Sequence, residues 1–281
     1  MRRYVLTLQC DDRPGIVRSL ADGIFEAKGN ILESSQFSDT ATGRFFMRTN
    51  FESPEDNVKD VRATIAELVA PFDPSLMLRS EGRRRRTMIM VSRLDHCLID
   101  LLYRWEIGEL PIDIEVVVSN HDDCRPIAER HGVPFEHVAV TPATKSAAEA
   151  RMLELMDEHA VDFVVLARYM QILSNEVCAR LPGRVINIHH SFLPGFKGAK
   201  PYQQAFDRGV KLIGATAHYV TADLDEGPII EQDVVRVTHA DDPGALAAVG
   251  RDVERVVLAR AVRLHAEDRV LVSGARTVVF T

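Results

Sequence analysis

Residues 184–233 read RVINIHHSFLPGFKGAKPYQQAFDRGVKLIGATAHYVTADLDEGPIIEQD, and this stretch decides the fold of the second half of the chain. It opens with an apolar run, Val185 to Ile188, that is typical of a buried strand. A loop rich in proline and glycine follows, then a helix over about 201–208 and a strand over 211–220. Strand, helix and strand in this order indicate an α/β sheet, whose sites lie at the carboxyl ends of strands. We expect the loops after the two strands to leave one edge of the sheet and to carry the chemistry.

One amide, one imidazole and one carboxylate stand out in this stretch: Asn187, His189 and Asp225. Asn187 and His189 are two positions apart, so their side chains project from the same face of a strand. Each of the three could also be structural, since a histidine at a strand end commonly bonds its neighbours and Asn or Asp commonly stabilises a turn. Taken together, the three residues indicate a hydrolase or an acyl transferase.

Composition narrows the classes of function. The 281 residues, 46% of them hydrophobic and 27% charged, suit one large domain or two ordinary ones. A net charge of -7 does not favour nucleic acid or an anionic membrane as a partner. The four cysteines never form CxxC, so we expect neither disulfides nor structural zinc, and a reducing compartment. No apolar run approaches about 20 residues and the start has no signal-peptide core, so we predict a cytoplasmic protein.

The first 80 residues have their own rhythm. Strand-like segments over 4–10, 31–38, 44–51 and 72–78 alternate with amphipathic helices over 16–28 and 55–69. This βαββαβ order is the split βαβ, or ferredoxin-like, plan. We therefore predict a first domain over 1–80, a linker over 81–86 and a second domain over 87–281. Arginines fill positions 83–86 of the linker, and in a net acidic chain we interpret them as a solvated hinge.

From residue 87 onward, apolar strands alternate with helices, and a long helix over 252–266 and a terminal hairpin over 270–280 end the pattern. Near-continuous apolar strands predict a mostly parallel, Rossmann-like sheet covered on both faces. The first strand is followed by SRLDH at 92–96, which is neither GxGxxG nor a P-loop, so neither NAD nor ATP is expected. We expect no cofactor. The histidines fit no ligand pattern such as HExxH, so no metal is expected either.

The motifs around the three polar residues resemble those of folate-dependent formyltransferases. They read NIHHSFLP at 187–194, DLDEGPII at 223–230 and VLARYMQIL at 165–173. The resemblance implies catalytic roles for Asn187, His189 and Asp225. The residues for which it implies substrate binding are Met170, Gln171, Ile172, Leu173, His190, Gly198, His218, Glu226 and Gly227.

The order of the two halves resembles the formyltetrahydrofolate deformylase family, in which an ACT domain, a small amino-acid-sensing module, precedes the formyltransferase domain. DRPGIV at 12–17 is similar to the ACT motif, and the resemblance covers practically the whole chain. It implies hydrolysis of 10-formyltetrahydrofolate to formate and tetrahydrofolate, which supplies formate for purine biosynthesis and balances the one-carbon pool. The transferase of glycinamide ribonucleotide has a Gly-Ser-Asn phosphate loop where this chain has SRLDH. We therefore expect that no phosphorylated amine is accepted.

The same resemblance implies a folate substrate, glycine and methionine as effectors, and assembly into a homo-oligomer. A helix N-terminus favours a carboxylate ligand, so we place the effector at the first turn and the start of the next strand. The effector-binding residues expected there are Asp12, Arg13, Pro14, Gly15, Asn30 and Ile31. Two alternatives remain open for the chain, a formyltransferase acting on an amine and a non-catalytic regulator. A third concerns the first domain, which could serve only for dimerisation.

The implied mechanism gives each catalytic residue a role. Asn187 and His189 donate to the oxyanion of a tetrahedral intermediate, and Asp225 is the general base. Apolar neighbours would raise the pKa of Asp225 and a protonated His189 would lower it, and the sequence leaves that balance open. Since adjacent strand positions face opposite sides, we expect His190→Ala to be milder than His189→Ala.

Overall fold

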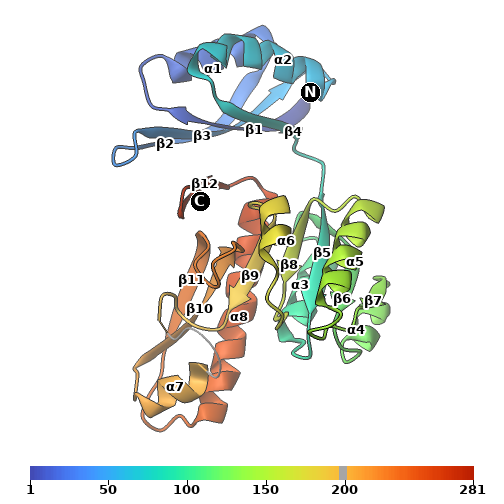
Figure 1. Ribbon diagram of the computed structural model, residues 1–281. Helices are drawn as coiled ribbons and strands as arrows, with labels where there is room; N and C mark the ends of the chain where they lie inside the picture. The colour runs from blue at the N-terminus through green and yellow to red at the C-terminus, as the bar shows by residue number, and fades with distance from the viewer. Residues whose placement is uncertain (196–200) are drawn as a thin grey trace. The chain divides into compact units, whose positions relative to one another are not determined.

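The computed structural model describes residues 1–195 and 201–281, and its contacts divide the chain into two compact units (Figure 1). Unit 1 comprises Met1–Arg84, Asp268–Leu271 and Val278–Thr281. Unit 2 comprises Arg85–Glu267 and Val272–Thr277. This division differs from the one expected from the sequence, which assigned the whole terminal hairpin to the second domain. The predicted residue Gly198 lies outside the described residues.

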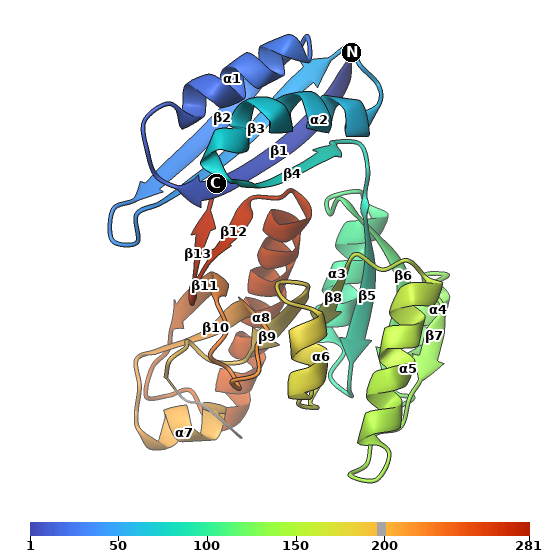
Figure 2. The ribbon, with the colours of Figure 1, turned by 45° about the horizontal axis from the view of Figure 1, so that its top comes forward.

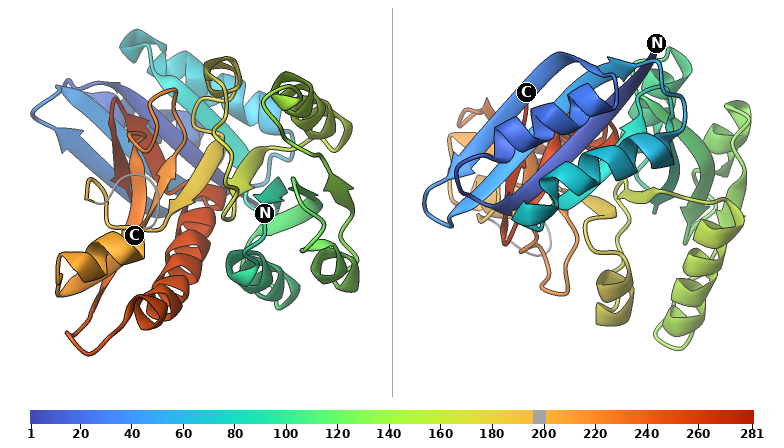
Figure 3. Two further views of the ribbon diagram at one scale, coloured as in Figure 1. Left: turned by 60° about the horizontal axis from the view of Figure 1, so that its bottom comes forward. Right: turned by 90° about the horizontal axis from the view of Figure 1, so that it is seen from above.

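Unit 1 is an antiparallel sheet with two helices on one face. Its elements are β1 (Arg2–Asp11), α1 (Ile16–Glu26), β2 (Asn30–Asp39), β3 (Arg44–Ser53), α2 (Val58–Val69), the 3-10 turn η1 (Ala70–Phe72) and β4 (Ser75–Ser80). The strand order is β2-β3-β1-β4. The helices α1 and α2 lie side by side over the sheet (Figure 3). Their apolar stripes bury residues such as Leu20, Ile24 and Ile65 against Leu6 and Phe51 of the strands.

The face of this sheet opposite the helices explains why the chain's last segment belongs to unit 1. Phe46 of β3 is buried in a cluster with Leu271 and Phe280, apart from the core beneath the helices. An ion pair joins the buried Asp268 to Arg79 of β4. Burial of apolar side chains together with a paired buried carboxylate ties the outer parts of the terminal hairpin to the first sheet.

Unit 2 is a sheet with helices on both faces. Its strands are β5 (Arg85–Val91), β6 (Ile112–Ser119), β7 (Phe135–His137), β8 (Phe163–Leu166), β9 (Val185–His189), β10 (Leu212–Tyr219) and β11 (Ile229–Arg236), in the order β11-β10-β9-β8-β5-β6-β7. From β7 to β9 neighbouring strands are parallel, whereas β10 is antiparallel to both β9 and β11. The expectation of a mostly parallel α/β sheet is confirmed.

The helices of unit 2 are α3 (His96–Glu106), α4 (Arg125–Arg130), α5 (Lys145–Glu158), α6 (Asn175–Arg180), α7 (Pro201–Asp207) and α8 (Pro243–Ala266). The helices α5 and α6 cover one face of the sheet, and α3 and α8 cover the other (Figure 2). The small hairpin formed by β12 (Val270–Ser273) and β13 (Arg276–Val279) follows α8. Within the described part of the chain, no helix combines the length and the apolar character needed to cross a membrane.

The strand β11 and the helix α8 are among the elements that differ from the expectation. The strand β11 was not anticipated, because its alternating half-exposed residues follow directly on an acidic loop. The helix α8 begins at Pro243, nine residues before the expected start at 252. Asp242 caps it, since its side chain accepts a hydrogen bond from the backbone N–H of Ala245 at 2.8 Å. This part of the helix was not predicted because its first turns contain glycine, which has a low helix propensity.

Candidate active site

The pairing of β9 with β10 assembles the first half of the site. In this antiparallel pair, His218 lies directly opposite Asn187, and Thr216 lies opposite His189. Because side chains alternate along a strand and opposite residues share a face, Asn187, His189 and His218 project from the same side of the sheet. The amide and two imidazoles therefore lie together on one face.

The loop that carries Asp225 reaches this face by a route that the sequence analysis did not predict. Since β10 runs antiparallel to β9, the loop starts beside the beginning of β9, where the N–H of Val220 donates to the carbonyl oxygen of Val185 at 2.9 Å. The expectation that both loops leave the same edge of the sheet was therefore wrong. The loop instead folds back over the face, and Oδ1 of Asp225 comes to 3.3 Å from Nδ1 of His189 and 3.8 Å from Nε2 of His218.

Two backbone features make this return possible. Asp225 has a left-handed conformation with φ 58°, which Asp tolerates better than most residues. Gly227 lies so close to β10 that an added Cβ would be 1.7 Å from the carbonyl oxygen of Tyr219. Gly227, predicted from the resemblance to bind substrate, thus lies where the loop packs on the strand and is not among the residues that line the cavity.

The sequence left open whether the pKa of Asp225 is raised or lowered, and its contact with His189 decides this. The hydrogen bond from His189 lowers the pKa of Asp225, and the charges of His189 and His218 act in the same direction, against the opposing effect of burial. Asp225 is therefore a carboxylate at neutral pH. The other ring nitrogen of His189, Nε2, is buried and has no hydrogen-bond partner among the residues described. This nitrogen therefore has hydrogen-bonding capacity that the described residues do not use.

His218 fixes the orientation of Asn187. Burial lowers the pKa of His218, so its ring is neutral at pH 7. Its Nδ1 lies 2.9 Å from the carbonyl oxygen of Tyr219, which can only accept, so the ring proton is on Nδ1. Nε2 is then the acceptor for Nδ2 of Asn187 at 3.2 Å. The second hydrogen on that Nδ2 remains available for a substrate oxygen.

A cavity of about 490 Å³ lies in front of these side chains. This volume is within the range of small-molecule sites. The predicted residues that line it are Asn187, His189, Asp225, Met170, Gln171, Ile172, Leu173, His190 and His218. Glu226, like Gly227, is not among its lining residues. Met170 and Ile172 are each 58% exposed, which leaves apolar surface uncovered at the mouth of the cavity.

Strand alternation predicted that the side chain of His190 points away from the site, and this prediction was wrong. The strand β9 ends at His189, so alternation no longer applies at the next residue. The rings of His189 and His190 stack with centroids 5.1 Å apart, and both line the cavity. Burial lowers the pKa of His190 to about 4, and the charges of Arg168 and His189 add to the effect. His190 is thus a neutral imidazole at pH 7.

Two further residues that line the cavity, Arg168 and Tyr202, were not predicted from the sequence to have a role. Both contact Glu254 of α8, which is 1% exposed: Tyr202 donates to Oε1 at 2.5 Å and Nη1 of Arg168 lies 3.3 Å from Oε2. Arg168 has φ 64°, an uncommon conformation for a residue other than glycine, and such strain is often found at sites. Arg168 lies within the VLARYMQIL motif, so the sequence contained a signal for it. Glu254 carried no such signal, because in the sequence it looks like any glutamate on a helix surface.

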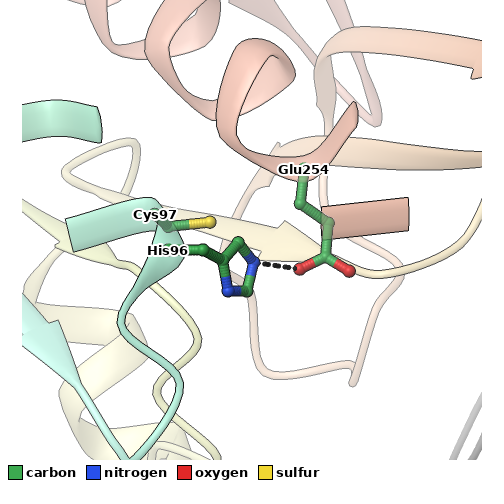
Figure 4. Close-up of side chains that lie close together, drawn as sticks. All are labelled: His96, Cys97 and Glu254. Atoms are coloured by element: carbon green, nitrogen blue, oxygen red, sulfur yellow. Dashed lines mark hydrogen bonds and ion pairs between the residues drawn. The ribbon is translucent and has the colours of Figure 1, made fainter. Parts of the chain in front are cut away.

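His96, Cys97 and Glu254 lie close enough to be considered as metal ligands, with donor atoms within 4.8 Å of one another (Figure 4). His96 Nε2 is 2.8 Å from Oε2 of Glu254, while Tyr202 and Arg168 occupy the rest of that carboxylate. Burial raises the pKa of the Cys97 thiol well above its usual value, which disfavours the thiolate that a metal requires. A nearby guanidinium would also repel a cation, so these residues are better described as a hydrogen-bonded network.

This α/β sheet carries an amide, an imidazole and a carboxylate beside one cavity, and its sequence places it in the class of formyl transferases. Residues 85–262 match the family model described as Formyl transferase. The structure of glycinamide ribonucleotide transformylase 1 from Symbiobacterium toebii is similar, with a TM-score of 0.67 and 33% identity over 72% of this chain and 97% of that one.

Other similarities extend over the full length. A formyltetrahydrofolate deformylase from Corynebacterium sp. (strain P-1) is 49% identical over 99% of this chain and 98% of that protein. The crystal structure of a formyltetrahydrofolate deformylase from Burkholderia mallei has a TM-score of 0.96 and 49% identity, covering 100% of both chains. The chain belongs to the formyltetrahydrofolate deformylase family.

Proposed function

We propose that this chain hydrolyses 10-formyltetrahydrofolate to formate and tetrahydrofolate. Membership in the deformylase family supports this proposal. The observation that carries it is the grouping of Asn187, His189 and Asp225 at one cavity, with the free Nε2 of His189 available there. These groups supply a base and two donors, which hydrolysis of an amide requires.

The chemistry follows from the formyl group being an amide. Asp225 takes a proton from water as the water oxygen bonds to the formyl carbon, and the carbonyl oxygen becomes an oxyanion. Nδ2 of Asn187 and Nε2 of His189 are the proposed donors to that oxyanion. Asp225 then passes the proton to N10, and the bond from carbon to N10 breaks. We propose that these side chains and water suffice, without a metal or cofactor.

The walls of the cavity suit a folate. Met170, Ile172 and Leu224 are all more than half exposed and lie around the same opening. Apolar side chains at a cavity mouth favour a flat aromatic ring, because they are removed from water when the ring binds. We infer that the pterin ring lies against these residues.

The segment after β5 supports water, rather than a phosphorylated amine, as the acceptor. Oγ of Ser92 donates to Asn120 Oδ1 at 2.7 Å and accepts from the N–H of Met170 at 2.9 Å. His96 at the end of this segment bonds Glu254. The side chains of Ser92 and His96 thus form hydrogen bonds within the protein, and Ser92 holds the backbone at Met170. We infer that this segment does not bind a substrate phosphate.

For unit 1 we propose an ACT domain that binds glycine or methionine and pairs in a cytoplasmic homo-oligomer. Gly15 precedes α1 with φ 103° and gives no side-chain cap, so amides at the helix start are available to a carboxylate. Arg13 beside it bonds the carbonyl of Pro71 and stacks on Phe72, which orders the turn. Ile31, with Leu32 and Phe37, leaves apolar surface exposed on the edge strand β2, which supports pairing between copies.

The test is to incubate the protein with 10-formyltetrahydrofolate and to quantify formate and tetrahydrofolate, with and without amine acceptors. We expect equal amounts of both products in the absence of any amine. Tetrahydrofolate release that requires an added amine would support the transferase alternative instead. Calorimetry with glycine and with methionine on the intact chain tests the effector proposal, and light scattering tests the assembly.

A further inference from the structure

Arg168 is a buried cation, and part of its hydrogen-bonding capacity is not used. The residue is 8% exposed and lines the same cavity as Asn187, His189 and Asp225. Its Nε and Nη1 have no hydrogen-bond partner in the part of the chain that the structure describes. A buried donor without a partner is costly, and a charged one more so. The arrangement therefore favours a ligand that brings oxygen atoms to this guanidinium.

The ion pair with Glu254 does not account for these free donors. Nη1 of Arg168 lies 3.3 Å from Oε2 of Glu254, yet it is not in hydrogen-bonding geometry. The carboxylate instead accepts from His96 at 2.8 Å and from Tyr202 at 2.5 Å. Glu254 thus holds the guanidinium by charge and leaves its N–H groups available.

The helix α8 is shaped to keep this network in place. Gly250, one turn before Glu254, leaves the space that Tyr202 fills, since an added Cβ would lie 2.0 Å from the Tyr202 Oη. Burial by itself would raise the pKa of Glu254, but His96, Arg168 and Tyr202 outweigh it and lower the pKa. Glu254 is therefore ionised, and it positions Arg168 beside the cavity.

We propose that Arg168 binds the formate product through its unpartnered N–H groups. This inference rests on the proposed hydrolysis, which makes a one-carbon carboxylate where a transferase makes an amide. Guanidinium and carboxylate form strong charge-assisted hydrogen bonds, often bidentate. Formate has only three non-hydrogen atoms, and Arg168 lines the same cavity of about 490 Å³ as Asn187, His189 and Asp225.

The proton balance is consistent with this role. Water adds its oxygen to the formyl carbon, Asp225 passes the first water proton to N10, and the bond from carbon to N10 breaks. The resulting formic acid releases its remaining proton to solvent and leaves as formate. Arg168 keeps its own protons throughout and contributes only hydrogen bonds and charge. The neighbouring His190, neutral at pH 7, neither competes for the anion nor repels it.

The test measures formate binding directly, without turnover. [13C]Formate is titrated into the protein, its carbon relaxation is followed, and acetate serves as a larger competitor. For so small a ligand we expect a Kd no tighter than on the order of 1 mM, so the titration extends to about 100 mM. Arg168→Gln should weaken binding by about tenfold to a hundredfold, the effect of losing hydrogen bonds to a charged group. The Kd of Arg168→Lys for formate should lie between those of the wild type and Arg168→Gln.

Two further variants make the result specific. Asp225→Asn should still bind formate, because it leaves Arg168 in place. Arg180→Gln removes the same charge from the exposed end of α6 and should bind formate like the wild type. Circular dichroism and thermal melting establish that each variant is folded.

The outcomes separate this inference from the proposed function. Failure of the wild type to bind formate overturns the inference whatever the variants do, as does equal binding by folded Arg168→Gln. Hydrolysis with no Arg168-dependent formate binding would remove the inference alone. Arg168-dependent binding without hydrolysis would remove the proposed reaction and leave an anion site.

Discussion

Nδ1 of His189 lies 3.3 Å from Oδ1 of Asp225, and this contact joins the end of β9 to the loop that follows the antiparallel strand β10. It keeps the carboxylate ionised and orients the imidazole so that Nε2 remains unpartnered at the cavity. The proposed base, Asp225, and a proposed oxyanion donor, His189, therefore contact each other directly, so replacing either residue should change the properties of the other.

Asp225→Asn should abolish most turnover while substrate binding survives. The amide keeps the shape of the carboxylate but cannot accept a proton, so kcat should fall by about 10²–10⁴. Single-turnover assays give the rate, and fluorescence titration with a folate analogue gives the Kd. Asp157→Asn on the exposed face of α5 is the matched control and should behave like the wild type. Retention of more than about a tenth of the wild-type kcat would exclude Asp225 as the base.

His189→Ala should raise the pKa of Asp225, because it removes the largest cause that lowers it. With the folded-state pKa below the unfolded value of about 3.9, the pair stabilises the wild type above that pH, and this contribution is lost as the pH falls through the folded-state pKa. Carbon NMR titration of the Asp225 carboxyl in the two proteins measures the change. An unchanged or lower pKa in His189→Ala would contradict the assignment.

His218→Ala should reduce kcat although His218 is not a proposed donor. Without Nε2 as acceptor, the Asn187 amide can rotate, and a lost oxyanion donor is worth about 10²–10³ in rate. We expect up to that loss for His218→Ala and partial recovery for His218→Gln, whose oxygen can accept. In a double mutant with Asn187→Ala, the losses should not add, because both act through one hydrogen bond. Additive losses would show that His218 acts independently.

His190 should make the protein less stable in mild acid. Its folded-state pKa is about 4, against about 6.5 when unfolded, so the unfolded chain takes up a proton first as the pH falls. Stability is thus lost between about pH 6.5 and 4, by at most about 2 kcal/mol at pH 5. Urea unfolding at pH 7 and pH 5 should show a smaller loss in His190→Gln. Equal losses in both proteins would mean that His190 is protonated in the folded state.

Gly227→Ala should destabilise the loop that carries Asp225. The added methyl group would meet the carbonyl oxygen of Tyr219, so the loop must shift, at a cost of about 1–3 kcal/mol. We expect lower unfolding free energy and lower kcat together. Gly82→Ala, where an added Cβ meets nothing within 4 Å, is the control and should change neither.

Much of the fold follows from local pattern. The alternation of residues placed Asn187 and His189 on one face, and near-continuous apolar strands indicated the mostly parallel sheet. Strand direction is not encoded in such a pattern, so the antiparallel course of β10 and the return of Asp225 over the face could not be read from it. That Asp225 meets His189 depends on a long-range pairing.

The second group of site residues was hidden for another reason. Glu254 follows two glycine-containing turns of α8 and resembles a solvated helix residue, although His96, Tyr202 and Arg168 surround it. Charged residues are normally exposed, and only the contacts of residues distant in sequence reverse that expectation here.

The cluster of Phe46, Leu271 and Phe280 has a consequence for how the chain is made. During synthesis the N-terminal domain usually folds first. Here unit 1 also includes Asp268–Leu271 and Val278–Thr281, so Phe46 on its four-stranded sheet stays uncovered until those residues have left the ribosome. The unit that is translated first is therefore finished last. Removing residues 1–80 would also leave Leu271 and Phe280 without Phe46. The roles of the two units are therefore better tested by substitutions than by truncation.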